Sequence, residues 1–157
     1  PRLMGTINNI SLQTTIDKIA DLPGCFVEIG VLWGFTFKRI AAHAQRLGKQ
    51  AHAFDSFEGV NHPGAKDDDA YPKGFLNIGG VSVFERIMLD TGMKRETYEI
   101  HQGWVPDCFI GFDQDISFAL VDVDHYQPTL DSLRWLEERM VVGGIIVLDD
   151  WFPYKEM

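Results

Sequence analysis

Short apolar runs alternate along the chain with stretches whose apolar residues recur at helical spacing. The runs predict five strands, the last two of the fully buried kind: Cys25–Ile29, 51–54, 98–101, Ile116–Val121 and 144–148. Strands that alternate with helices are typical of βαβ units. The fold class we predict is therefore α/β, a parallel sheet with flanking helices.

Four stretches with helical spacing accompany these strands. Two are predicted helices over 11–20 and 34–47, the second stopped by Gly48. A third is marked by Phe84, Ile87 and Met88 and ends before Gly92. The fourth has Pro128 in its first turn, and its inward face is predicted to comprise Leu130, Leu133, Leu136 and Met140.

The stretch from Glu58 to Gly80 shows neither helical nor strand periodicity and is rich in Gly, Pro and Asp. It is too long for an ordinary connection, so we interpret 59–80 as a lid or substrate loop inside a single domain that spans 1–157. Its acidic run, 67–69, is typical of a solvated surface.

Charge and composition exclude several classes of protein. The 157 residues carry 14 Lys plus Arg against 23 Asp plus Glu, a net charge of −9, which argues against binding to nucleic acid or to an anionic membrane. There is no apolar run of membrane-spanning length and no signal-peptide layout at the start, and Cys25 and Cys108 lie far apart. We therefore expect a cytoplasmic protein with two core cysteines.

Carboxylates follow four of the five predicted strands. Glu28 lies in the first strand, Asp55 ends the second, and the fourth and fifth continue into 122–124 and 149–150. The carboxyl ends of parallel strands form the ligand crevice of an open α/β sheet. Like charges crowded there cost free energy, so this edge calls for a cation or a hydrogen-bonded ligand.

Asp122, Asp149 and Asp150 are separated by one strand–helix–strand unit, which brings them within reach of one ion. Ligands that are all oxygen favour a hard cation, Mg²⁺ first. Asp124 is then a candidate general base, or a fourth ligand. The alternative is that Asp149 and Asp150 only cap the chain after the strand. Two other enzyme classes are alternatives: a phosphatase that uses Asp122-x-Asp124, and a nicotinamide dehydrogenase. Each accounts for fewer of these acidic residues.

The turn Glu28-x-Gly30-x-x-x-Gly34 permits close backbone approach to a ligand, although a strand–helix turn that binds nothing has the same form. Asp55 is suited to accept hydrogen bonds from ribose hydroxyls, or else to cap the following loop. Phe57 and Trp104 either stack on an adenine or pack in the core. His125 either assists proton transfer or packs at the sheet edge.

Four segments, in order, resemble the TylF-like, macrocin-type sugar O-methyltransferases of the class I methyltransferase superfamily. The matches span about residues 22–151. The first three segments are Gly24–Gly34 (GCFVEIGVLWG), Phe54–Gly59 (FDSFEG) and Gly103–Asp107 (GWVPD). The fourth comprises DVDHY from Asp122, then Thr129, and then GGIIVLDDW from Gly143. The resemblance implies a Rossmann-like fold that binds S-adenosylmethionine.

The resemblance also implies a role for each matched residue. Glu28 and Gly30 would lie at the methionine end of the cofactor, Asp55 at its ribose, and Ser56, Phe57 and Trp104 near its nucleoside. Gly34 and Gly103 would also belong to the cofactor site. Asp122, Asp149 and Asp150 would hold Mg²⁺, with Asp122 also beside the cofactor, and Asp124 would act as base. The acceptor would be a small hydroxylated molecule, a sugar or another vicinal diol, with a catechol-type acceptor as an alternative. The other hypothesis is a homologue that binds the nucleoside but catalyses no reaction.

The chain departs from that family at its end. The family's sheet continues with a helix and a β-hairpin after the Asp-Asp pair, which are missing from the seven residues that follow Asp150. We expect either a truncated chain or an exposed fifth strand that a partner subunit covers, hence a homo-oligomer.

Overall fold

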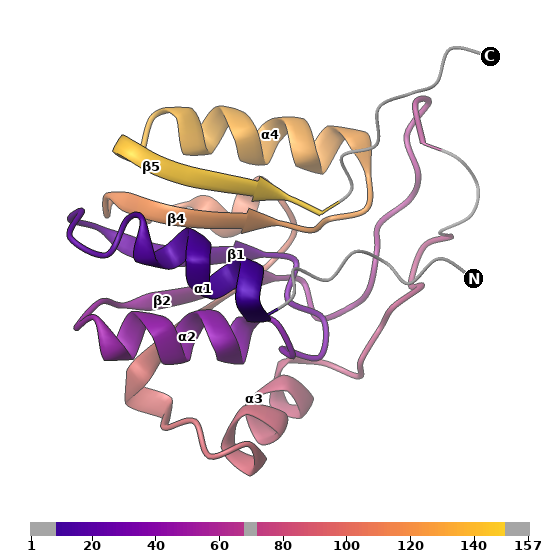
Figure 1. Ribbon diagram of the computed structural model, residues 1–157. Helices are drawn as coiled ribbons and strands as arrows, with labels where there is room; N and C mark the ends of the chain where they lie inside the picture. Colours follow the sequence, from indigo (N-terminus) through magenta and orange to yellow (C-terminus); the bar gives the residue numbers. More distant parts are fainter. Residues whose placement is uncertain (1–8, 68–71, 150–157) are drawn as a thin grey trace.

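The computed structural model describes residues 9–67 and 72–149. In this part of the chain five parallel strands form one sheet in the order β3-β2-β1-β4-β5 (Figure 1). The strands are β1 (Cys25–Ile29), β2 (Ala51–Asp55), β3 (Tyr98–Gln102), β4 (Ile116–Val121) and β5 (Met140–Leu148). All five predicted strands are confirmed. The strand order reverses between β1 and β4, so the fold has its ligand-binding switch point there.

Helices cover both faces of the sheet. They are α1 (Asn9–Asp17), α2 (Phe37–Arg46), α3 (Val81–Asp90) and α4 (Tyr126–Glu137), with 3-10 turns at Arg95–Thr97 and Asp107–Phe109. In the described ranges no helix combines the length and the apolar character that crossing a bilayer requires.

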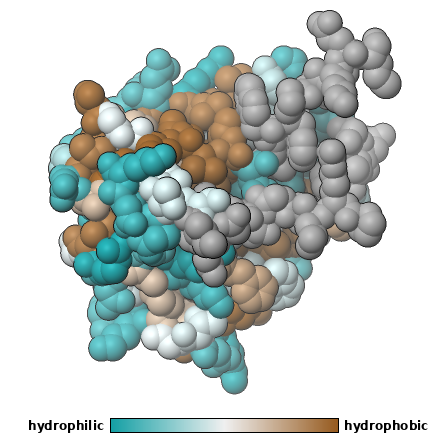
Figure 2. Space-filling model, viewed as in Figure 1, coloured by the Kyte–Doolittle hydropathy of each residue, from teal (hydrophilic) through white to brown (hydrophobic). Residues whose placement is uncertain are grey.

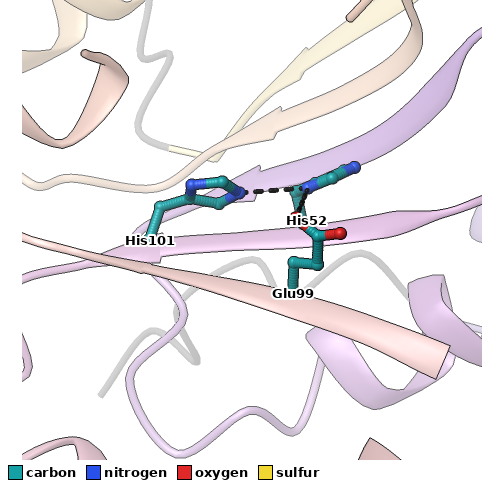
Figure 3. Close-up of side chains that lie close together, drawn as sticks. All are labelled: His52, Glu99 and His101. Carbon is teal, nitrogen blue, oxygen red and sulfur yellow. Dashed lines mark hydrogen bonds and ion pairs between the residues drawn. The ribbon is translucent and has the colours of Figure 1, made fainter. Parts of the chain in front are cut away.

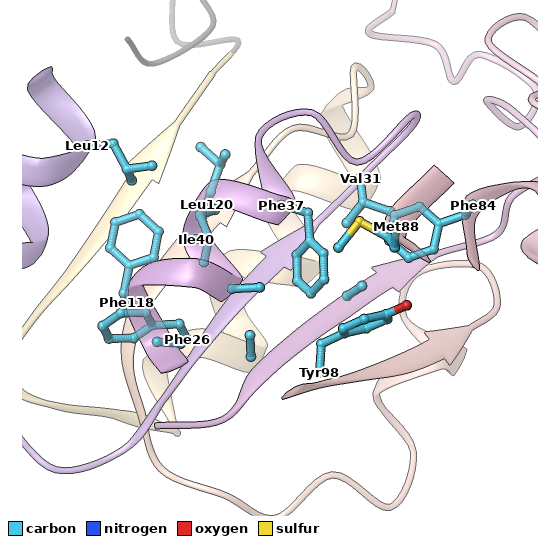
Figure 4. Close-up of a cluster of buried hydrophobic side chains, with 14 of the residues drawn as sticks. Leu12, Phe26, Val31, Phe37, Ile40, Phe84, Met88, Tyr98, Phe118 and Leu120 are labelled. Carbon is cyan, nitrogen blue, oxygen red and sulfur yellow. The ribbon is translucent and has the colours of Figure 1, made fainter. Parts of the chain in front are cut away.

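The two faces of the sheet have separate cores because alternate strand residues point to opposite sides. On one face, residues of α1, α2 and α3 pack with Phe26, Tyr98 and Phe118 of the sheet (Figure 4). On the other face Phe54 contacts Phe109, Phe112 and Trp135, with ring centroids 5.4–5.5 Å apart. These two cores hold the strands that carry the acidic residues.

The C-terminal elements differ from the sequence prediction in two respects. Helix α4 ends at Glu137, and Met140 begins β5 instead of extending the helix. The buried residues of α4 are Ser132, Trp135 and Leu136, while Leu130 and Leu133 are half-buried. The helix is shorter because the chain must return to the sheet beside Ile116, with which Met140 pairs.

Strand β5 is also less buried than predicted. It pairs only with β4 in the described sheet, and Val142 is 96% exposed. Hydrophobic residues are visible at the surface in this region of the molecule (Figure 2). An edge strand lacks the second neighbour that buries a central strand such as β4, whose six residues are all buried.

Candidate active site

A cavity of about 310 Å³ opens at the carboxyl edge of the sheet. Residues from the ends of all strands except β3, from the loop after β3, and from the segment after β2 line it. Nine of the predicted site residues are among them: Glu28, Gly30, Asp55, Ser56, Gly103, Trp104, Asp122, Asp124 and Asp149. The expectation that the acids converge on one rim is therefore met for these residues; Asp150 lies outside the described part of the chain.

Strand register explains why these residues meet. Ile29 pairs with Phe54 on one side and with Val121 on the other, and Val121 pairs with Leu148. The residues that follow these four are Asp55, Gly30, Asp122 and Asp149, so they form one row across the sheet edge. Backbone hydrogen bonds continue the ladder into this row, from Asp122 N to Ile29 O at 2.8 Å and from Asp149 N to Val121 O at 3.1 Å.

Gly30 lies in this row because no other residue fits there. Its φ is +83°, and a Cβ atom would lie 1.8 Å from the carbonyl oxygen of Asp122. The glycine thus lets the end of β1 approach the end of β4 closely. The turn after β1 and the acidic rim are coupled through this contact.

Asp55 fastens the loop that follows β1. Its Oδ2 accepts hydrogen bonds from the backbone N–H groups of Val31 (2.8 Å) and Leu32 (3.1 Å), and its Oδ1 accepts one from Phe57 N (2.7 Å). A carboxylate has about four acceptor positions, so capacity for a ribose hydroxyl remains. These hydrogen bonds support the alternative that Asp55 caps the loop that follows it. A contact between Asp55 and a ribose hydroxyl stays a prediction.

Glu28 is a buried carboxyl group in the middle of the sheet. Only 2% of the residue is exposed, and its Oε2 has no hydrogen-bond partner within the described residues. Burial raises the pKa of Glu28 well above its usual value, and the neighbouring Asp122, Asp55 and Asp149 carboxylates raise it further, against the opposing effect of Arg39. A buried acceptor that faces a cavity without a partner is suited to a cationic or hydrogen-bond-donating ligand.

This pKa predicts how Glu28→Gln changes stability. With its raised pKa, folded Glu28 retains a proton that the unfolded chain releases above its ordinary value of 4.5, so the group's stabilising contribution is present at low pH and lost as the pH rises. At pH 8 and without ligands we expect the variant to melt a few degrees higher than the parent, and its stability to fall less between pH 5 and 8.

Thermal melts across that pH range test the prediction. Glu137→Gln, at an exposed position of α4, is the matched control and should leave the pH dependence unchanged. A Glu28→Gln variant with the same pH slope as the parent would show that this carboxyl carries no such penalty.

Asp122, Asp124 and Asp149 are all half-buried at the cavity wall. Both Asp122 and Asp149 raise the pKa of Glu28. Asp124 has a left-handed backbone, φ +61°, a conformation that Asp and Asn adopt more readily than most residues. These three residues offer only oxygen donors, the type of ligand that a hard divalent cation prefers.

His125 and Ser56 add two buried polar groups to the wall. His125 is 4% exposed, and its Nε2 lacks a hydrogen-bond partner in the described ranges. The Ser56 hydroxyl donates to Gly59 O and accepts from Glu58 N, both at 3.1 Å, so it holds the turn after β2. His125 is thus a buried polar group beside the cavity, whereas Ser56 shapes the loop after β2.

Two predicted cofactor residues do not line the cavity. Phe57 is 2% exposed and packs on Phe84, with ring centroids 5.1 Å apart. Gly34 is also directed to α3, since a Cβ there would lie 2.7 Å from the Phe84 ring. Their contribution is to hold the loops beside the cavity. Burial raises the pKa of each free cysteine thiol, Cys25 and Cys108, to about 12, in keeping with core residues.

The apolar side of the cavity was not predicted from the sequence. Leu32, Trp33, Phe35, Val60 and Leu76 line it, and Trp33 and Phe35 are 39% and 61% exposed. A signal was available, because two aromatic residues flank Gly34 in a loop where solvation favours polar residues. These side chains give the cavity a hydrophobic wall opposite its acidic one.

A parallel sheet with a ligand cavity at its switch point, walled by a glycine turn and several carboxylates, is the architecture of the Rossmann-like class I methyltransferases. The family described as a methyltransferase domain matches residues 27–151. The chain belongs to this family.

Two kinds of relative support this assignment. The chain is 29% identical over 159 residues to 8-demethyl-8-(2,3-dimethoxy-alpha-L-rhamnosyl)-tetracenomycin-C 4'-O-methyltransferase of Streptomyces olivaceus, a match that covers 90% of this chain and 59% of the relative. Among solved structures, the O-methyltransferase NovP has a TM-score of 0.76 at 21% identity, with 90% of this chain and 64% of that one covered. The calicheamicin methyltransferase CalS11 has a TM-score of 0.74 at 19% identity, covering 88% and 62%. The chain thus spans about three-fifths of the length of these relatives, and the solved structures support the fold alone.

Proposed function

We propose that this chain is the catalytic core of an S-adenosylmethionine-dependent and Mg²⁺-dependent O-methyltransferase that acts on a hydroxyl group of a glycosylated small molecule. The observation that carries the proposal is the buried Glu28, whose Oε2 has no hydrogen-bond partner among the described residues, in a cavity that Asp122 and Asp149 also line. Carboxyl groups crowded in this way suit a cavity that receives a sulfonium cofactor and a divalent cation.

For the cofactor, the chain offers the strand-end row and the loops beside it. Glu28 would accept hydrogen bonds from the cationic methionine end at its Oε2, beside the close approach of β1 and β4 at Gly30. Asp55, which already orders the loop after β1, would accept a ribose hydroxyl, with Ser56, Gly103 and Trp104 around the nucleoside. Phe57 and Gly34 would act indirectly, by fixing the loops.

For the reaction, bound S-adenosylmethionine supplies an electrophilic methyl group and bound Mg²⁺ lowers the pKa of a coordinated hydroxyl. Asp122, Asp149 and Asp150 would hold the metal. Asp124 would accept the proton of the acceptor hydroxyl at a carboxylate oxygen. The apolar wall at Leu32, Trp33 and Phe35 would exclude water and orient the acceptor.

The acceptor class that we propose is supported by the relative whose name gives a rhamnosyl-tetracenomycin as its substrate. We infer membership of the TylF-like subfamily, with a sugar as acceptor and a catechol as the alternative. The segment 59–80 would serve as the lid. Its Val60 and Leu76 line the cavity, and Asp67 Oδ1 accepts a hydrogen bond from Tyr126 N at 2.7 Å, which links the segment to the start of α4.

Metal removal and Asp122→Asn together test the proposal. With S-adenosylmethionine and a rhamnosylated polyketide as acceptor, we expect methyl transfer that excess chelator abolishes and added Mg²⁺ restores. Asp122→Asn should lower transfer at least 100-fold, because it removes a charged metal ligand, while calorimetry still detects cofactor binding.

Asp113→Asn is the matched control, at an exposed position outside the cavity, and should retain the parent's rate. Transfer that persists in chelator would contradict the metal's role. Cofactor binding without transfer to any sugar or catechol acceptor would favour the non-catalytic reading.

A further inference from the structure

A second group of metal-ligating side chains lies away from the cavity, where β2 and β3 run side by side. His52 comes from β2, and Glu99 and His101 come from β3 (Figure 3). His52 pairs directly with Glu99 in the strand register, and His101 follows two residues later, so all three point to the same face of the sheet. None of these residues lines the cavity.

The three side chains bring their ligand atoms close to one another. His52 Nδ1 lies 3.0 Å from His101 Nε2 and 3.7 Å from Glu99 Oε2, and all three atoms lie within 4.8 Å of one another. Two ligand atoms that share a tetrahedral Zn²⁺ at about 2.05 Å are roughly 3.3 Å apart. The two distances from His52 Nδ1 differ from this value by a few tenths of an ångström, and the third pair of atoms lies within 4.8 Å.

We propose that His52, Glu99 and His101 form a binding site for a transition-metal ion of the Zn²⁺ class, separate from the acidic cavity. Two imidazoles and one carboxylate select such an ion over Mg²⁺, which prefers oxygen ligands. Three protein ligands leave a fourth position for water. The half-exposed Glu99 side chain gives the ion access from solvent, whereas His52 is fully buried.

The protonation state of the two histidines suits this role. Burial lowers the pKa of His52 to about 4 and also lowers the pKa of His101, so both rings are neutral at pH 7. In the metal-free protein, one ring donates a hydrogen bond to the other, and the two nitrogen atoms are 3.0 Å apart. On metal binding that proton moves to the other nitrogen of the same ring, which frees both facing nitrogens as ligands without net proton release.

The consequence of metal binding would be structural. The ion would tie the edge strand β3 to β2, in addition to the backbone ladder between them. His101 also stacks on Phe54, with ring centroids 4.3 Å apart, and Phe54 lines the cavity. A metal ion held by His101 would therefore also steady a residue of the cavity wall.

Zinc titration in the presence of excess Mg²⁺ tests the inference. We expect calorimetry of the metal-free protein to show one equivalent of Zn²⁺ bound although millimolar Mg²⁺ is present, and Zn²⁺ to raise the melting temperature. Bound Co²⁺ should give the visible absorption of a low-coordinate site. His101→Gln and Glu99→Gln should each weaken Zn²⁺ binding at least tenfold and diminish the Co²⁺ signal.

Two matched variants keep the test specific. His62→Gln and Glu96→Gln remove an exposed histidine and an exposed glutamate outside the cluster, and they should leave Zn²⁺ affinity within twofold of the parent. Asp122→Asn should also leave it unchanged, which separates this inference from the proposed function. Zn²⁺ affinity that survives in His101→Gln, or that is lost in Asp122→Asn, would overturn the inference, as would no binding in folded parent protein.

Discussion

Asp124→Asn is expected to lower the rate of methyl transfer by about 10²–10⁴-fold and to leave binding of S-adenosylmethionine within a few-fold of the parent. The amide keeps the size and shape of the carboxylate but cannot take up the acceptor proton. Asn also tolerates the left-handed backbone at this position, φ +61°, so the loss would come from chemistry and not from strain. Single-turnover rates with the cofactor bound, and calorimetry for its affinity, measure the two effects.

The pH profile supplies the control for this interpretation. If Asp124 is the base, the parent's rate falls at low pH as this carboxylate is protonated, and the variant loses that limb. Asp107→Asn, exposed on the 3-10 turn near the cavity but not lining it, should behave as the parent does. If Asp124→Asn retains most of the parent's rate, another group must act as the base. The buried His125 is the nearest candidate in sequence.

The acidic rim could be predicted because it depends on periodicity and topology alone. Each carboxylate follows a strand that its apolar run identifies, and the carboxyl ends of parallel strands share an edge. The observed register then places Asp55, Asp122 and Asp149 in one row, as that reasoning requires. Matching motifs added the residues of the loops, most of which also line the cavity.

Side-chain direction in loops could not be predicted in the same way. Phe57 follows a strand end as Trp104 does, but its backbone is left-handed, φ +59°, and its ring packs in the core. The hydrogen bonds from the Val31 and Leu32 amides to the Asp55 carboxylate depend on how two loops fold together. The cluster of His52, Glu99 and His101 likewise depends on which strands are neighbours, since His52 precedes Glu99 by 47 positions and His101 by 49, and the two strands share no motif.

Gly30→Ala is expected to be the most destabilising single change in the site. A methyl group would lie 1.8 Å from the Asp122 carbonyl oxygen and 2.7 Å from its carbon, distances that only a separation of β1 from β4 can relieve. That separation would break the hydrogen bond from Asp122 N to Ile29 O and widen the acidic row. We expect a loss of more than 3 kcal/mol, out of the 5–15 kcal/mol typical of a domain, measured by urea unfolding.

Gly48→Ala separates the clash from the backbone conformation. Gly48 also has a positive φ, +68°, but a Cβ there would meet nothing within 4 Å. This control should lose only the roughly 1–2 kcal/mol cost of placing alanine in the left-handed region. The difference between the two variants therefore measures the close approach of β1 and β4 itself. Equal losses at the two positions would mean that the strand ends can separate freely, and the row of Asp55, Asp122 and Asp149 would then not depend on Gly30.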